Sequence, residues 1–139
     1  MAAMSEDARD AFLRETRIGI FTTLNADGSP LAIPIWYEWD GTKARMFTSM
    51  TSPKVARLRR DGRVCLTVAE PVGVPEAWVT IEGVATIEEG TGFALAQRLA
   101  PRYYPPEQAA QTLEVWARVA DDWATLVVEP GRIRSSAPE

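Results

Sequence analysis

The chain has 139 residues, 46% of them apolar and 24% charged, with a formal net charge of −4, and we expect residues 1–139 to form a single domain. It has no histidine, which excludes Ser-His and Cys-His catalysis and any zinc or haem site held by histidine. Cys65 is its only cysteine, which excludes an internal disulfide and a cysteine metal cluster, so an enzyme of this composition would depend on a bound cofactor.

Apolar periodicity and turn residues predict six strands and four helices. In chain order these are a helix over 5–15, strands over 17–24, 31–39 and 43–49, a helix over 52–60, strands over 63–70 and 78–89, helices over 91–101 and 106–120, and a strand over 122–130, before a polar tail at 131–139.

Two Asp-Gly turns, at Asp27 and Asp40, predict that the first three strands form a meander. Pro34 donates no ladder hydrogen bond, so its strand is expected at a sheet edge or a bulge, and Gly83 is expected at another bulge. Six mostly antiparallel strands with an inserted helix indicate a mainly β fold. A small barrel is favoured because closure removes exposed strand edges.

A hydroxyl-rich segment leads directly into the basic helix predicted at 52–60. Ser52 is a suitable N-cap and Pro53 suits the first helical position, which places Lys54 where its charge opposes the helix dipole. Free backbone amides, hydroxyls and a lysine together favour a bound phosphate. The alternative is a plain capping serine beside a solvated lysine, with the arginines of the helix forming a solvated face.

Aromatic residues gather in the strand predicted at 31–39. Trp36 is expected on one face of this strand, and Tyr37 and Trp39 on the other. Such residues pack in cores or dimer seams. Beside the irregular backbone at Pro34, they would also form a wall for a planar heterocycle.

The order of these motifs resembles the flavin/deazaflavin oxidoreductase superfamily, the proteins related to pyridoxamine-phosphate oxidase. The resemblance covers Arg17 to Ile87, with a weaker similarity at 126–134. It rests on IGIFTTL, the DGSP hairpin, PIWY, a second DG hairpin, FTSMTSPKVARLRRDGRV and VTIEGVA. It implies a six-stranded antiparallel split β-barrel of the Greek-key, FMN-binding type, with a few peripheral helices.

The resemblance also implies a cofactor site, with no metal and no assigned catalytic residue. The cofactor phosphate would be held by Thr48, Ser49, Thr51, Ser52 and Lys54. Arg57 stands where many relatives have asparagine, and either adds a phosphate contact or faces water. The ring would lie along Ile33, Pro34, Ile35 and Trp36, largely through their backbone. Members of this superfamily are homodimers with the cofactor at the interface, where the second subunit would contribute residues from the strand at Trp78–Ile81 and from the C-terminal part.

The implied function is hydride transfer between coenzyme F-420 or FMN and a small conjugated or heteroaromatic substrate. Arg57, Arg59, Arg60 and Arg63 could attract the acidic tail of F-420, which favours it slightly over FMN. The C-terminal substrate-binding motif of pyridoxamine-phosphate oxidases is not recognisable in GRIRSSAPE, so a typical oxidase of that kind is not expected. The alternative is a non-catalytic protein that binds or carries a flavin nucleotide.

Neither nucleic acid nor a membrane is an expected partner. The sequence pI is about 5.0 and acidic residues occur throughout the chain, whereas a nucleic-acid-binding barrel needs a basic face. No apolar run approaches the length of a membrane span, and the acidic N-terminus does not resemble a signal peptide. With one cysteine, the expected compartment is the cytoplasm.

Overall fold

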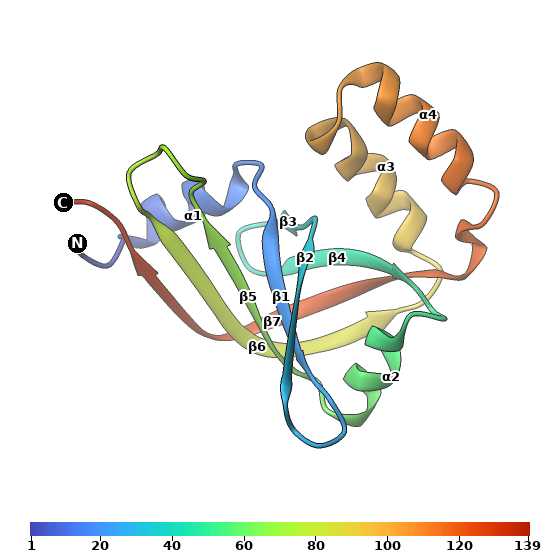
Figure 1. Ribbon diagram of the computed structural model, residues 1–139, viewed down its shortest axis with the longest axis horizontal. Coiled ribbons are helices and arrows are strands. Elements are labelled where there is room, and N and C mark those ends of the chain that lie inside the picture. Colours follow the sequence, from blue (N-terminus) through green and yellow to red (C-terminus); the bar gives the residue numbers. More distant parts are fainter.

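The computed structural model describes residues 1–139 as a strongly curled antiparallel sheet with helices at its ends and along one edge (Figure 1). Its elements are α1 (Glu6–Arg14), β1 (Gly19–Leu24), β2 (Pro30–Ile35), β3 (Glu38–Trp39), β4 (Ala44–Ser49), α2 (Pro53–Arg60), β5 (Arg63–Ala69), β6 (Trp78–Glu88), α3 (Gly92–Tyr103), α4 (Pro106–Trp116), a 3₁₀ turn (Ala120–Asp122) and β7 (Trp123–Ser136).

The sheet confirms the mainly β split-barrel prediction, with seven strands instead of six. Its order is β2-β1-β5-β6-β7-β4-β3. The strand expected over 31–39 divides at Trp36 and Tyr37, because Tyr37 turns into the core, is 2% exposed and donates its hydroxyl to the Leu13 carbonyl at 3.0 Å. The predicted meander is therefore wrong, since β2 and β3 lie at opposite ends of the sheet. The edge position predicted for Pro34 is confirmed.

The C-terminal segment is not a polar tail. β7 continues to Ser136 and pairs with β6 from Thr125 to Ser136, with Ile133 opposite Ile81. A register shift between Glu82 and Gly83 confirms the predicted bulge and lets Pro130 pass without ending the strand. The polar residues of this segment alternate with Ile133, which faces the core from the end of β7.

The core fills the concave side of the sheet and is closed by helices at both ends. Phe21, Leu66, Ile81 and Leu126 are fully buried there. α1 contributes Phe12 and Leu13 at one end, while α2 packs Val55 and Leu58 near β1 and β6 at the other.

A hairpin of α3 and α4 packs outside the sheet, against β4 and β7 (Figure 1). α3 continues past Pro101, where we expected it to end, to Tyr103. A proline removes one amide donor, and the following turn still closes with the Tyr104 N–H bonded to the Ala100 carbonyl at 2.9 Å. No helix is both long and apolar enough to cross a lipid bilayer.

Candidate functional site

The start of α2 holds a cation with no acidic partner. Ser52 caps the helix, its Oγ accepting the Lys54 N–H at 3.3 Å, and Pro53 is the first helical residue, as predicted. Lys54 is half-buried, and burial together with the nearby Arg57 lowers the pKa of its ammonium below the usual 10.5. The other lysine, Lys43, pairs with Glu129 at 3.2 Å, whereas Lys54 has no carboxylate within salt-bridge distance. A partly desolvated cation of this kind favours an anionic ligand.

The predicted hydroxyls divide between two sides of the sheet. Thr48 is 8% exposed and faces the core, so only its neighbour Ser49 faces outward. The Ser49 Oγ lies 2.8 Å from the Thr51 Oγ1 and donates to the Asp122 carboxylate at 3.0 Å. Ser52 keeps its hydroxyl proton free for an acceptor, because its Oγ serves as the acceptor in the helix cap. Ser52 is therefore better placed for a phosphate than Thr48, and also than Thr51, whose hydroxyl donates to Ser49.

Arg57 belongs to the same helix face as Lys54, one turn later. Its Nε donates to the Oγ1 of Thr23 at 2.8 Å, and Thr23 is a 1%-exposed residue of β1. Arg57 therefore lies against the sheet instead of extending into solvent. Its two terminal nitrogens, which have no acceptor in the structure, remain available to an anion at Lys54.

An apolar pocket of about 260 Å³ is lined by Ile18, Pro34, Ile35, Trp36 and Phe47. Three of the four residues predicted to line a ring are among them. The fourth, Ile33, is opposite the buried Phe21 and does not line this pocket.

Sequence reasoning missed Ile18 and Phe47. Strand alternation could have found Phe47, because it precedes Ser49 by two positions and so lies on the same face of β4. A two-residue step along a strand spans about 7 Å, so β4 connects this pocket to the hydroxyl segment.

Aromatic rings form a continuous wall beside the pocket. Trp36 stacks on Tyr103 with 4.7 Å between ring centroids and 5° between planes, and Phe47 stacks on Trp123 at 5.5 Å and 11°. Trp116 of α4 lies 5.9 Å from Trp36 and 5.6 Å from Phe47. Trp36 thus lines the pocket and also packs against Tyr103 and Trp116. Tyr37 and Trp39 are core residues on the opposite face, as the alternation predicted.

Trp78 lies on the outer face of the same sheet, away from this pocket. Ala69 is opposite Trp78, and continuing the registers of β1 with β2 and β5 places Ile18 between Ala69 and Trp36. Three strand spacings separate the two tryptophans, or about 14 Å. One chain does not bring Trp78 to the pocket, so its contribution from a second subunit stays a prediction.

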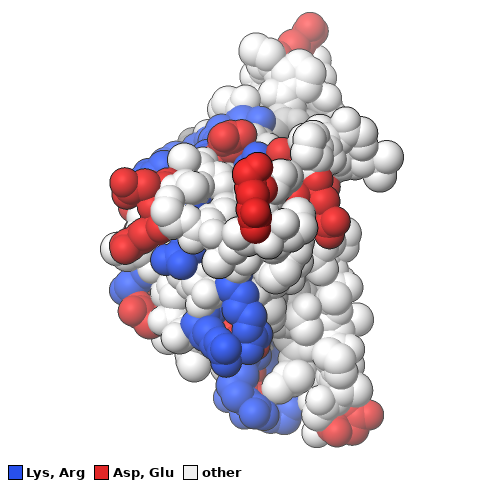
Figure 2. Space-filling view, turned by 90° about the vertical axis from the view of Figure 1, so that its left-hand side faces the viewer, with Lys and Arg blue, Asp and Glu red and all other residues white.

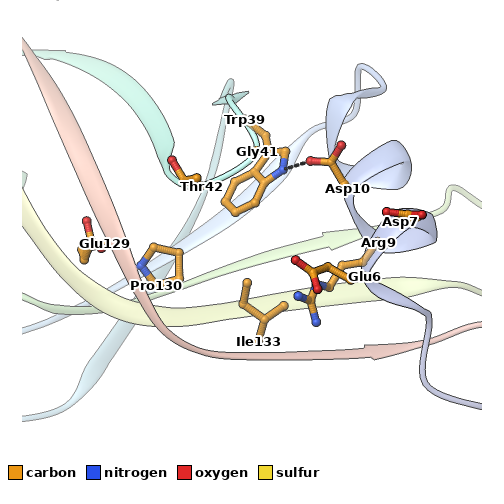
Figure 3. Close-up of a pocket in the computed structure, with 10 residues that line it drawn as sticks. All are labelled: Glu6, Asp7, Arg9, Asp10, Trp39, Gly41, Thr42, Glu129, Pro130 and Ile133. Atoms are coloured by element: carbon orange, nitrogen blue, oxygen red, sulfur yellow. Dashed lines mark hydrogen bonds between the residues drawn. The ribbon is translucent and has the colours of Figure 1, made fainter.

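A second hollow, of about 380 Å³, lies between α1, the β3–β4 turn and β7, and Figure 3 shows its lining. None of the predicted site residues lines it. It is rich in carboxylates, two of which have partners: Asp10 accepts hydrogen bonds from Arg14 and Trp39, both at 2.9 Å, and Glu129 pairs with Lys43. These two hydrogen bonds lower the pKa of the Asp10 carboxyl, and the bond from Arg14 has the larger effect. An acidic hollow repels a phosphate, so we assign the site to α2 and the aromatic wall.

Charges are segregated on the surface despite the net negative charge. Figure 2 shows Lys and Arg side chains gathered in the lower part of one face, with most acidic side chains above them. α2 itself contains four cations, Lys54, Arg57, Arg59 and Arg60, and no acid. A positive region of this kind can attract an anionic ligand to a protein whose net charge is negative.

A family-wide sequence model for pyridoxamine 5′-phosphate oxidase matches residues 5–127. The chain belongs to the pyridoxamine 5′-phosphate oxidase family. The chain is also 30% identical over 107 residues to an F420H(2)-dependent biliverdin reductase of Mycobacterium tuberculosis, with 74% of each chain covered.

Solved structures agree with this family fold. A conserved hypothetical protein of M. tuberculosis superimposes with a TM-score of 0.75 at 26% identity, over 96% of this chain and 85% of that one. A putative pyridoxamine 5′-phosphate oxidase of Listeria innocua superimposes with a TM-score of 0.66 at 20% identity, over 94% and 96% of the two chains. The latter likeness shows the fold alone.

Proposed function

We propose that this protein is an oxidoreductase that transfers a hydride between a bound flavin or deazaflavin and a small conjugated or heteroaromatic substrate. The observation that carries the proposal is the half-buried Lys54, without a carboxylate partner, at the start of the helix that follows β4, the strand whose Phe47 lines an aromatic-walled pocket. The relative named as an F420H(2)-dependent reductase supports it.

The residues present fit a phosphorylated planar cofactor. Lys54 and Ser52 would hold its phosphate, and Pro34, Ile35 and Trp36 would hold its ring. The bound ring would supply the hydride, which explains why a chain without histidine can carry out redox chemistry. The protein would orient the ring against its substrate and exclude water with the aromatic wall.

We favour coenzyme F-420 as the cofactor, with FMN as the alternative. Some of the arginines expected to attract an acidic tail are already hydrogen-bonded within the protein, and others are not. Arg63 is bound to Asp61 at 2.7 Å and Arg57 to Thr23, whereas Arg59 and Arg60 are exposed and form no ion pair. These two free cations lie at the end of α2, about one and a half turns beyond Lys54, where a tail would leave the phosphate site.

Equilibrium dialysis against FMN and coenzyme F-420, followed by turnover assays of the reduced cofactor with enone, quinone and tetrapyrrole acceptors, tests the function. We expect tighter binding of F-420 and oxidation of its reduced form by at least one acceptor. Binding without turnover would favour a non-catalytic flavin carrier, and no binding of either cofactor would overturn both possibilities.

We also propose a cytoplasmic homodimer that buries the outer face of β1, β2 and β5. Ile18 and Ile20 are 48% and 37% exposed there, beside the exposed Pro34 and Ala69. Exposed apolar residues contiguous with a cofactor pocket are typical of a surface covered by a second copy. A partner on this face would bring its own Trp78 toward the pocket.

An Ile20→Glu variant is expected to run as a monomer and to bind cofactor at least about tenfold more weakly, because a charge in a dimer core costs several kcal/mol. Val115→Glu is the matched control, since Val115 is also exposed but belongs to α4. Sedimentation velocity with and without cofactor measures the change. A wild-type chain that stays monomeric with cofactor bound would contradict the dimer.

A further inference from the structure

The pairing of β1 with β2 stops beside the apolar pocket, where a side chain from α3 occupies the ladder. The last pair is Gly19 with Ile35, and continuing this register by two residues places Arg17 opposite Tyr37. Neither of these residues is in a strand. Their backbone groups are bridged instead by the Tyr103 hydroxyl, which accepts the Tyr37 N–H at 3.2 Å and donates to the Arg17 carbonyl at 2.7 Å.

The same tyrosine also fixes the wall of the pocket. Its ring stacks on Trp36, 4.7 Å away and nearly parallel, and its hydroxyl lies 3.4 Å from the Tyr37 carbonyl. Ile18 and Trp36, the residues between the last ladder pair and the bridged pair, both line the pocket. The opening between the strands and the pocket therefore occur at the same place.

We propose that Tyr103 is a positioning residue that wedges β1 and β2 apart and so holds open the ring-binding pocket. A hydroxyl between an N–H and a carbonyl separates the two strands by more than a direct backbone hydrogen bond would. Without it, Tyr37 and Arg17 would pair directly and draw Ile18 toward Trp36. This inference rests on the proposed function, because it names the device that shapes that site for a ring.

The neighbouring Tyr104 provides a matched control. Its ring also touches Trp36, edge-on at 4.9 Å, but its hydroxyl forms no hydrogen bond in the structure. Tyr103→Phe keeps the stacking ring and removes only the bridging hydroxyl. Tyr104→Phe removes a hydroxyl that lies outside the pocket lining and forms no bond to the ladder.

Affinities for riboflavin and FMN, measured by equilibrium dialysis on wild type and both variants, test the wedge. Tyr103→Phe should weaken both ligands by about tenfold, because the narrowed pocket no longer fits the ring, while their affinity ratio stays unchanged because the phosphate site is intact. Tyr104→Phe should bind both as wild type does. Wild-type riboflavin affinity in Tyr103→Phe, or an equal loss in Tyr104→Phe, would overturn the inference.

A crystal structure of Tyr103→Phe separates this inference from the proposed function. We expect a direct hydrogen bond from the Tyr37 N–H to the Arg17 carbonyl, extending the β1–β2 ladder toward α1. An unchanged gap between these two atoms would overturn the wedge even if the variant bound flavins poorly. If wild type binds no flavin or deazaflavin, the proposed function fails, while the ladder in this structure still decides whether Tyr103 holds the strands apart.

Discussion

Lys54→Ala is expected to bind FMN and coenzyme F-420 about ten- to a hundredfold more weakly, the loss of one charge-assisted phosphate contact. The fold should remain intact, because Lys54 has no carboxylate that its removal would leave unpaired. Removing a partly desolvated cation from a helix N-terminus also relieves an unfavourable charge in the ligand-free protein. Equilibrium dialysis gives the affinities, and thermal unfolding without ligand checks the fold.

Two further substitutions show whether Lys54 acts through its position. Arg59→Ala removes a cation from the same helix at an exposed site, and should leave FMN affinity within about twofold of wild type. Lys54→Arg keeps the charge and should retain most of the affinity. Equal losses in Lys54→Ala and Arg59→Ala would show that only the overall charge of α2 matters, and would remove the phosphate site from Lys54.

The pH dependence of binding follows from the same ammonium. Burial and Arg57 lower the pKa of Lys54 below 10.5, so its charge is lost at a lower pH than that of an exposed lysine. The protonated form attracts phosphate, so FMN affinity should fall as pH rises toward this pKa. In Lys54→Arg the decline should be shallower, because the guanidinium stays charged. Parallel declines in the two proteins would contradict the assignment.

Gly83→Ala is expected to lower the free energy of unfolding by about 3 kcal/mol, among the larger effects of a single substitution. A Cβ at this position would lie 2.1 Å from the Glu129 carbonyl oxygen and 3.0 Å from its carbon, inside the β6–β7 bulge. Both neighbours are backbone atoms of a paired strand, so relief requires the ladder itself to move. The midpoint of thermal unfolding should fall by about 10 °C.

Gly131→Ala is the control within the same pair of strands. Its Cβ would meet only the Glu82 carbonyl oxygen, at the ordinary contact distance of 3.6 Å. We expect a change within about 0.5 kcal/mol, as for most surface substitutions. Similar losses of unfolding free energy at the two positions would mean that the bulge tolerates a side chain at Gly83. The destabilisation would then not come from a clash with the Glu129 backbone.

Local rules predicted the parts of the site that depend on neighbouring residues. Ser52, Pro53 and Lys54 occupy the predicted positions because a helix N-terminus is determined by its own first turn. Alternation likewise placed Tyr37 and Trp39 on the face opposite Trp36, and in the structure both are buried.

Features that depend on tertiary contacts could not be predicted in this way. The strand over 31–39 breaks because Tyr37 finds a buried acceptor on Leu13, 24 positions earlier. β7 continues through Pro130 and Gly131, which resemble a stop in the sequence, because Gly131 bulges out of β7 where Glu82 and Gly83 of β6 pair with Arg132 and Pro130. Ile18 precedes any strand, and it lines the pocket only because β1 and β2 separate there.

The arrangement of the tryptophans has a consequence for spectroscopy. Trp36, Trp116 and Trp123 form a chain of rings, with Trp116 centred 5.9 Å from Trp36 and 5.4 Å from Trp123, and Trp36 lines the pocket. Trp39 lies near α1, its indole nitrogen bonded to Asp10. Excitation migrates between rings this close, so an absorbing ligand at Trp36 should quench the emission of all three. Trp39 lies outside this chain of rings, so the quenching of the other three reports directly on occupation of the pocket.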